Sequence, residues 1–254
     1  MKIIHCHPKY QHLKSEIENL IKDFDNKGEA VTIGQRNVIK SFEVNGLKLN
    51  IKSFKKPNAF NSFIYKWIRP SKAKRSFEYA SRLIDCEIST PFPIAYIEET
   101  SVFGLKNSYY ISEHINYDFE FRALIHNPKF PNREEILQKF SEFTFKLHEN
   151  NINFLDHSPG NTLVVKTEQG YKFYLIDLNR MRFENMTFDK RMYNFRRLWL
   201  SKTMIKVIAE KYSELYKKPY QETHDLMLKH SMAFQHKINR KKLRRSGRKM
   251  QFKS

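Results

Sequence analysis

Apolar and polar residues alternate along three consecutive segments in the first quarter of the chain. The segments are EAVTI at 29–33, VIKSFEV at 38–44 and LKLNIKSF at 47–54. Alternation with a period of two is typical of strands that bury one face. Asn45-Gly46 joins the last two segments, and this pair accepts the positive φ angles of a tight hairpin turn. The pattern predicts a three-stranded antiparallel meander.

Helical spacing of apolar residues replaces this alternation elsewhere. Three segments have the pattern of an amphipathic helix: 10–24, 71–86 (with Ser71 as its N-cap) and 133–150. Four shorter segments are typical of further strands: 93–99, 108–115, 162–166 and 172–177. The bulky basic and aromatic segment 56–71 is predicted to be a connection. From about residue 188 the chain is predicted to be helical to its end.

This order of elements predicts an α+β fold with two lobes. The N-lobe, residues 1–115, is expected to hold an antiparallel sheet with one main helix. The C-lobe, residues 116–236, is expected to be mainly helical. Residues 237–254 form a basic tail that carries nine Lys or Arg and no acid. At 254 residues the chain is long enough for two modest lobes.

The residues that point to chemistry follow the helix predicted for 133–150. Asp156 and Asn161 stand five apart in the turn-rich stretch FLDHSPGN, and Asp177 ends a strand-like run sixteen residues later. In the kinase catalytic loop an aspartate and an asparagine have the same separation, and a metal-binding aspartate follows on the next hairpin. Phosphoryl transfer needs a carboxylate near the attacking hydroxyl and oxygen ligands for magnesium. The spacing predicts Asp156 as the base, and Asn161 and Asp177 as magnesium ligands.

A cation for the nucleotide phosphates is predicted upstream of this stretch. Lys52 lies inside the third strand segment, and Glu78 lies in the middle of the helix that follows. A strand lysine paired with a helix glutamate positions the α- and β-phosphates of ATP in kinases. Gly34 and Arg36, in GQRN between the first two strands, are candidates for phosphate contact, but a plain β-turn explains that segment equally well.

Together these motifs resemble the lipopolysaccharide core kinases, the family of Kdo and heptose kinases, and most closely its Bacteroidetes-type branch. The resemblance runs from about residue 7 to 183 over HPKYQHL, GQRN, LNIKSFKKPN, RPSKAKRSFEYASRLI, TPFPIAYIE, SYYISE, LHENNINFLDHSPGNTLV and YLIDLNRMRF. It implies a protein-kinase-like bilobal fold with ATP and Mg²⁺ as cofactors. It also implies transfer of the γ-phosphate to a sugar hydroxyl of the lipopolysaccharide inner core, with Kdo on a lipid A precursor as the expected acceptor.

The resemblance gives the same site residues the same roles. Lys52 and Glu78 match the nucleotide-positioning pair, Asp156 matches the base, and Asn161 and Asp177 match the metal ligands.

Two positions depart from the pattern of this family. Phe154 stands where members usually have a histidine that braces the catalytic loop from behind. Asp177 is followed by Leu-Asn rather than by Phe-Gly, the pair that forms part of the active/inactive switch of regulated protein kinases. The second departure favours a small-molecule or glycan kinase over a regulated protein kinase.

Four charged or polar residues near the loop have a functional and a structural interpretation. Arg180 and Arg182 either bind a phosphate or carboxylate of the acceptor or form surface ion pairs. His157 is either a substrate contact or a solvated loop residue. For His148, near the end of a helix, the sequence favours a structural role.

The net charge of +19 at pH 7 favours anionic partners. The tail and the basic-aromatic segment 54–75 are either solvated or lie on an anionic membrane surface. The chain has two distant cysteines and no apolar run of about 18 residues, and its start lacks the apolar stretch of a signal peptide. These features predict the cytoplasm. The resemblance to the lipopolysaccharide core kinases implies a peripheral place on the cytoplasmic face of the inner membrane, with a lipid A precursor as partner.

Two other functions stay open at this point. A catalytically weak kinase-like protein that binds lipopolysaccharide would keep the same residues. A basic nucleic-acid-binding protein would explain the charge. The sequence has no zinc-finger or RNA-recognition signature, so nucleic acid is not an expected partner.

Overall fold

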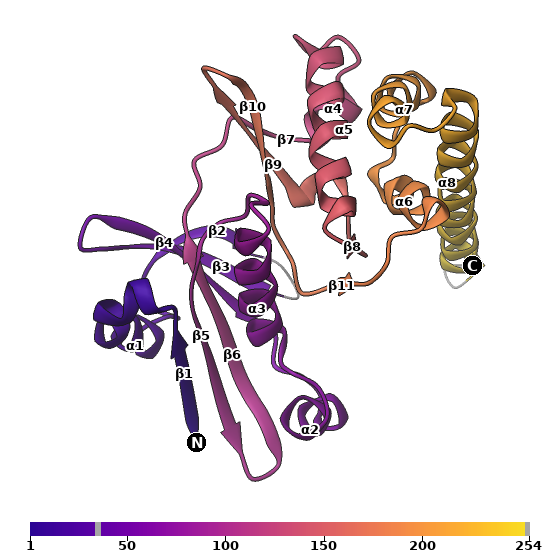
Figure 1. The fold of residues 1–254 in the computed structure, drawn as a ribbon. Helices are drawn as coiled ribbons and strands as arrows, with labels where there is room; N and C mark the ends of the chain where they lie inside the picture. The colour runs from indigo at the N-terminus through magenta and orange to yellow at the C-terminus, as the bar shows by residue number, and fades with distance from the viewer. Residues whose placement is uncertain (34–36, 252–254) are drawn as a thin grey trace. The chain divides into compact units, whose positions relative to one another are not determined.

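The computed structural model describes residues 1–33 and 37–251, whose elements fall into two units (Figure 1). Unit 1 comprises Met1–Asn116 together with Asp177–Asn179, and unit 2 comprises Tyr117–Ile176 and Arg180–Ser254. The boundary suggested by the sequence lies one residue away, between 115 and 116. The sequence did not predict that Asp177–Asn179 belongs to unit 1.

Unit 1 is built on a six-stranded sheet in which every pair of neighbours is antiparallel. The strand order is β1-β5-β6-β4-β3-β2, with β1 Lys2–Cys6, β2 Glu29–Ile33, β3 Asn37–Val44, β4 Leu47–Phe54, β5 Pro93–Ser101 and β6 Gly104–Glu113. The predicted meander is confirmed as β2, β3 and β4. Asn45 and Gly46 have φ angles of 50° and 77°, as the hairpin turn requires. Strand β1 was not predicted.

The helices of unit 1 partly match the sequence pattern. They are the 3-10 helix η1 Pro8–Leu13, α1 Lys14–Lys22, α2 Ala59–Trp67 and α3 Lys72–Asp85. The single helix expected over 10–24 is therefore split in two. The Ser71 hydroxyl accepts a hydrogen bond from Lys74 N at 3.1 Å, so Ser71 is the N-cap of α3 as predicted. The segment predicted to be a connection contains a helix, α2.

The two faces of the sheet in unit 1 carry different side chains. On β4, Leu49 and Ile51 are fully buried in the larger core, which α1 joins through Ile17. Residues two apart on a strand share a face, so Lys52 and Phe54 lie on the opposite side. Phe54 packs there with residues of α3, and the Lys52 ammonium lies 5.3 Å from the Phe54 ring centroid. Lys52 therefore lies on the face of the sheet that α3 covers.

Unit 2 is mainly helical. Its helices are α4 Arg122–His126, α5 Arg133–Glu149, η2 Pro159–Asn161, α6 Phe188–Asn194, η3 Phe195–Leu198, α7 Lys202–Tyr216 and α8 Tyr220–Gln251. A three-stranded sheet has the order β10-β9-β7, and a two-stranded sheet pairs β11 with β8. The strands are β7 Phe119–Glu120, β8 Ile152–Phe154, β9 Thr162–Thr167, β10 Gly170–Leu175 and β11 Met181–Phe183. Most of the predicted basic tail continues α8.

Helices α5 and α7 form the centre of the core of unit 2. Phe140, Ile205 and Tyr212 are fully buried between them. The Tyr212 hydroxyl lies 2.8 Å from Nδ1 of His148, which is also fully buried. His148 is therefore structural, as the sequence favoured. In the part of the chain that the structure describes, no helix combines the length and the apolar character needed to cross a bilayer.

Gly104 lies where α2 packs on the β5–β6 hairpin, and its substitution tests that contact. Its φ is +138°, and an added Cβ would lie 2.5 to 2.6 Å from atoms of Ser62 on α2. We expect Gly104→Ala to lower the free energy of unfolding by about 2–4 kcal/mol in urea titrations, because backbone strain and a clash add.

The control for Gly104→Ala is Gly46→Ala. Gly46 has φ +77° but no neighbouring atom within 4 Å of an added Cβ, so only the strain is expected, at about 1–2 kcal/mol. Equal losses of stability in the two variants would contradict the close approach of α2 to the hairpin.

Candidate active site

Lys52 forms an ion pair with Asp177 within unit 1. The distance from Lys52 Nζ to Asp177 Oδ1 is 2.8 Å, and the two side chains are 13% and 33% exposed. Strand β4 is interior to the sheet, with Ile39 on β3 and Tyr110 on β6 as the register partners of Lys52. The backbone of Lys52 is therefore held by neighbouring strands on both sides, and its ammonium group is kept in a partly buried position. The structure thus brings together two of the residues that the sequence singled out.

The segment that carries Asp177 is held by two polar side chains. Asp177 has φ +59°, a left-handed conformation in which aspartate is enriched. Its Oδ1 accepts a second hydrogen bond from Asn179 Nδ2 at 2.6 Å. The buried Arg75 of α3 donates from Nη1 to the Asn179 carbonyl oxygen at 2.9 Å. Among the described residues, both contacts of the Asp177 carboxylate fall on Oδ1, so Oδ2 is the atom it can offer to a metal ion.

The Lys52–Glu78 pair expected from the sequence is not formed among the described residues. Glu78 is 47% exposed and lies 3.8 Å from Lys74, one turn earlier on α3. Asp177 is the acid that reaches the Lys52 ammonium, and Arg75 is the residue of α3 that reaches the Asp177 segment. A role for Glu78 in positioning nucleotide therefore stays a prediction.

Gly34 and Arg36, the two candidates for phosphate contact between β2 and β3, lie outside the described residues. Their role also stays a prediction.

The stretch from Phe154 to Asn161 joins β8 to β9 in unit 2, and Asp156 lies in it between two arginines. Asp156 Oδ1 is 2.7 Å from Nη2 of Arg197, which belongs to η3. Its Oδ2 is 3.8 Å from Nη1 of Arg180, and the Asp156 side chain is 22% exposed. Two guanidinium groups thus hold the carboxylate of the predicted base in one place.

Asn161 is oriented by the backbone of the same loop. Its Nδ2 donates to the Asp156 carbonyl oxygen at 2.8 Å, and its own carbonyl oxygen accepts from Ile176 N at 3.0 Å. An amide that donates through Nδ2 leaves Oδ1 as its acceptor for other partners. Asn161 therefore has the orientation that a metal-ligating amide needs, and it ties the loop to the residue that precedes Asp177.

His157 has neither of the two roles that the sequence left open, because its ring is fully buried. Nδ1 lies 2.9 Å from Asn194 Oδ1, and Asn194 Nδ2 donates to Asn153 Oδ1 and to the Phe154 carbonyl oxygen at 2.9 and 3.0 Å. The fully buried Phe154 ring lies 5.6 Å from the His157 ring. Asn194 and His157 thus brace the loop beside the buried Phe154 ring.

Burial gives both interior histidines low pKa values. Loss of hydration lowers the pKa of His157 to about 4 and that of His148 to about 3, despite their hydrogen-bonding partners. Both rings are therefore neutral at physiological pH. The loop is braced by neutral hydrogen bonds and not by a cation.

Sequence reasoning missed four residues of the site: Arg75, Asn179, Asn194 and Arg197. Asn179 and Arg197 carry weak signals, since Asn179 stands in the same LNR run as Arg180 and Arg197 stands in a pair of arginines. Arg75 and Asn194 carry none, because each acts through a residue distant in sequence. Arg182, which was considered with Arg180, lies exposed on β11, where it pairs in register with Asn153.

The donor set fits magnesium brought in with a nucleotide. Within the described ranges no three His, Cys, Asp or Glu side chains gather as a metal site. Mg²⁺ in phosphotransferases is bound by one or two protein ligands together with phosphates and water, so such a cluster is not required. Asp177 Oδ2 and Asn161 Oδ1 are oxygen atoms of the kind that Mg²⁺ prefers.

An antiparallel sheet with a central lysine, a helix on its face and a mainly helical second unit with an Asp-x4-Asn loop together define a protein-kinase-like fold. The chain matches the model of the lipopolysaccharide kinase (Kdo/WaaP) family over residues 11–220. It therefore belongs to this family, which supports a phosphotransferase acting on lipopolysaccharide.

A solved structure supports the fold. The structure of WaaP in complex with acyl carrier protein has a TM-score of 0.63, covering 94% of this chain and 97% of that chain at 13% identity. At this identity the likeness shows the fold alone. No curated protein sequence matches the chain. The acceptor must therefore be argued from the site itself.

The two buried histidines predict how stability depends on pH. An unfolded histidine binds a proton below about pH 6.5, whereas His157 stays neutral in the folded protein down to about pH 4. The buried histidines therefore do not lower the free energy of unfolding above pH 6.5. Below pH 6.5 that free energy falls by about 1.4 kcal/mol per pH unit for each such histidine. We expect His157→Gln to make this decline shallower in urea titrations between pH 7 and 5. Exposed His126→Gln should leave the slope unchanged, and a wild-type slope in His157→Gln would contradict the burial.

Proposed function

We propose that the protein is an ATP-dependent kinase that transfers the γ-phosphate to a sugar hydroxyl of the lipopolysaccharide inner core. The proposed acceptor is Kdo on a lipid A precursor. The observation that carries the proposal is the Lys52–Asp177 ion pair, in a chain of this family whose catalytic loop also keeps Asp156 and Asn161. These are the charged and polar groups that phosphoryl transfer requires.

The nucleotide is held by residues of unit 1 in this proposal. Lys52 pairs with the phosphates, and Glu78, Gly34 and Arg36 are further candidates for positioning them. Asp177 and Asn161 would hold Mg²⁺, which would supply positive charge to stabilise the phosphates during transfer. Before nucleotide binds, the Asp177 carboxylate and the Lys52 ammonium neutralise each other at 2.8 Å, so neither charge is left uncompensated.

The chemical step needs one proton acceptor and an in-line displacement. Asp156 accepts the proton of the attacking sugar hydroxyl through a carboxylate oxygen. The sugar oxygen then forms a bond to the γ-phosphorus, and the bond between that phosphorus and the β–γ bridging oxygen breaks, so ADP leaves with the bond's electrons. Arg197, at 2.7 Å from Oδ1, orients the Asp156 carboxylate for this role.

The two arginines beside Asp156 favour an acidic acceptor. Guanidinium groups bind carboxylates in a planar, bidentate manner, and Kdo is a sugar that carries a carboxylate. Arg197 is 30% exposed and Arg180 is 55% exposed, so both reach solvent as well as Asp156. An acceptor carboxylate that pairs with one of them would lie close to the base, and its hydroxyl would be oriented for proton transfer.

The acceptor also suggests where the protein acts. A lipid A precursor lies in the cytoplasmic leaflet of the inner membrane before export, so the protein is proposed to act there as a peripheral protein. The charge of +19 suits an anionic lipid surface. The lipopolysaccharide precursor is the proposed partner, and no nucleic acid is required.

Asp156→Asn tests the proposed base. We expect kcat for phosphate transfer from labelled ATP to Kdo-lipid A to fall by about 10²–10⁴-fold, because the amide cannot accept the proton. Thermal stabilisation by ATP and Mg²⁺ should be retained, since Asp156 does not bind the nucleotide. Asp189→Asn, on exposed α6, is the matched control and should keep wild-type turnover. Equal transfer by Asp156→Asn and wild type would exclude Asp156 as the base.

Arg197→Gln tests the acceptor site. We expect KM for the acceptor to rise by about 10-fold or more while KM for ATP stays unchanged, because a charge-assisted hydrogen bond to the acceptor is lost. The neighbouring Arg196→Gln is the control, since Arg196 stacks on Tyr193 and donates to its carbonyl oxygen instead. A rise in the KM for ATP, or the same change in both variants, would contradict the assignment.

A further inference from the structure

One face of α2 presents large aromatic side chains to solvent. Phe60, Phe63 and Trp67 are 75%, 52% and 64% exposed, and their spacing of three and four residues puts them on one side of the helix. The other side is attached to the protein, where the Ser62 hydroxyl donates to the Leu105 carbonyl oxygen at 2.7 Å. A water-soluble surface helix normally has the opposite arrangement, with its apolar face toward the core. The exposed stripe therefore points to a partner.

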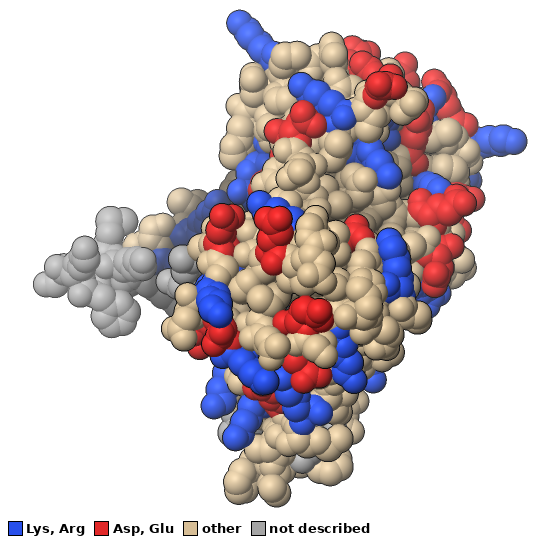
Figure 2. Space-filling view, turned by 90° about the vertical axis from the view of Figure 1, so that its left-hand side faces the viewer, with Lys and Arg blue, Asp and Glu red and all other residues tan. Residues whose placement is uncertain are grey.

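The end of the β5–β6 hairpin extends the same apolar surface. Val102 and Phe103 at the turn are 84% and 87% exposed. Figure 2 shows only uncharged side chains at this end of the hairpin, at the bottom of the view, whereas acidic and basic groups are mixed above it. Gly104 follows directly, and its missing Cβ lets the hairpin approach Ser62 of α2. The exposed aromatic face of α2 and the end of the β5–β6 hairpin thus lie next to each other in unit 1.

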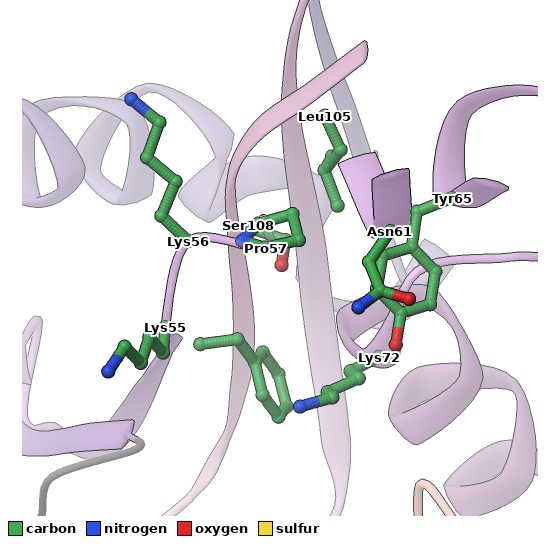
Figure 3. Close-up of a pocket in the computed structure, with 9 residues that line it drawn as sticks. Lys55, Lys56, Pro57, Asn61, Tyr65, Lys72, Leu105 and Ser108 are labelled. Carbon is green, nitrogen blue, oxygen red and sulfur yellow. The ribbon is translucent and has the colours of Figure 1, made fainter. Parts of the chain in front are cut away.

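A cationic pocket of about 340 Å³ lies against α2. Figure 3 shows Lys55 and Lys56 on one side of it, with their ammonium groups directed outward, and Asn61, Tyr65 and Lys72 on the other side. The floor includes Ser108 of β6, so hydroxyl and amide groups accompany the three lysines. Phosphate oxygens are the ligands that such a set of ammonium, amide and hydroxyl donors would bind.

The sequence around α2 has a strongly basic balance. Residues 55–75 contain seven Lys or Arg and no Asp or Glu. An interface with another protein usually depletes lysine and keeps aromatic residues in a buried centre. Lysines combined with exposed Phe and Trp on a short helix are typical of a helix that lies in the boundary between headgroups and acyl chains.

We propose that α2, the end of the β5–β6 hairpin and the lysine pocket form a docking surface for an anionic lipid bilayer. Phe60, Phe63 and Trp67 insert at the level of the headgroups, and the pocket lysines bind lipid phosphates. The inference gives the peripheral location in the proposed function a defined surface, and it rests on that proposal only for the identity of the membrane. All residues of the docking surface belong to unit 1, and Asp156 and the catalytic loop are not among them.

Trp67 is a built-in reporter for this surface. The chain has two tryptophans, so Trp199→Phe leaves Trp67 as the sole emitter. We expect its fluorescence to shift to shorter wavelength with phosphatidylglycerol-containing vesicles, and to be quenched when the lipid carries bromine on its acyl chains. Phosphatidylcholine vesicles should give a much smaller shift at the same lipid concentration, because they offer no net charge to the lysines.

Two groups of variants separate the apolar and the cationic contributions in vesicle co-sedimentation. Phe60→Ser with Phe63→Ser is expected to lower partitioning by 10-fold or more, because two inserted rings are lost. The triple variant Lys55→Gln, Lys56→Gln, Lys72→Gln is expected to lower it by about fivefold per lysine at low salt. The triple variant Lys2→Gln, Lys14→Gln, Lys22→Gln changes the same charge at exposed positions elsewhere in unit 1, and should lower partitioning much less.

Several results would overturn the docking surface. They are equal losses in the two lysine triples, unchanged partitioning of the Phe60/Phe63 variant, or a Trp67 emission that does not respond to anionic vesicles. An acidic protein as the true occupant of this surface would also leave Trp67 unchanged by vesicles.

A soluble acceptor keeps this test independent of the kinase proposal. Transfer of phosphate to a deacylated, water-soluble core sugar should be unchanged in the α2 variants. Loss of vesicle binding with that transfer intact confirms the docking role alone. Vesicle binding without any transfer would instead contradict the proposed activity.

Discussion

The ion pair between Lys52 and Asp177 is the interaction on which the rest of the site depends. It joins an interior strand of unit 1 to a three-residue segment whose neighbours in sequence belong to unit 2. Desolvation makes a partly buried charge costly unless it is paired, so each of the two side chains requires the other until a nucleotide and its metal arrive. The same pairing prepares a cation for phosphate and a carboxylate for magnesium.

The two aspartates of the proposed mechanism form ion pairs with different cations. Asp177 pairs with a lysine ammonium, a point charge that can move from a carboxylate to a phosphate with little change in geometry. Asp156 pairs with the planar guanidinium of Arg197, which suits a fixed carboxylate and a planar acceptor group. Behind Asp156, Asn194 and the neutral His157 brace the loop beside the buried Phe154 ring.

The parts of the fold that were predicted from the sequence are those that local patterns determine. The β2–β3–β4 meander, the Asn45-Gly46 turn and the Ser71 cap each follow from neighbouring residues. Strand β1 was missed because it pairs with β5, more than ninety residues later. Helix α2 was missed although its aromatic residues have helical spacing, because the basic and aromatic segment was interpreted as a connection; its aromatic face is exposed.

In the candidate active site too, local motifs were recognised in the sequence and long-range contacts were not. Motif spacing and the family resemblance predicted Lys52, Asp156, Asn161 and Asp177 as residues for chemistry, and these roles stay predictions. Their contacts were not predictable, because Arg75, Asn194 and Arg197 reach them only through the tertiary fold. The expected Lys52–Glu78 pair is not formed among the described residues, where α3 contributes Arg75 to the segment that Lys52 contacts, and the role of Glu78 stays a prediction.

The central claim is that this chain adds one phosphate to an inner-core sugar with Asp156 as the base. Mass spectrometry of core oligosaccharide from cells that lack the gene, complemented with wild type or with Asp156→Asn, tests it most directly. The account predicts core oligosaccharide that lacks one phosphate group in the deletion strain, with recovery by wild type only. An unchanged phosphate content in the deletion strain, or equal recovery by both proteins, would contradict it.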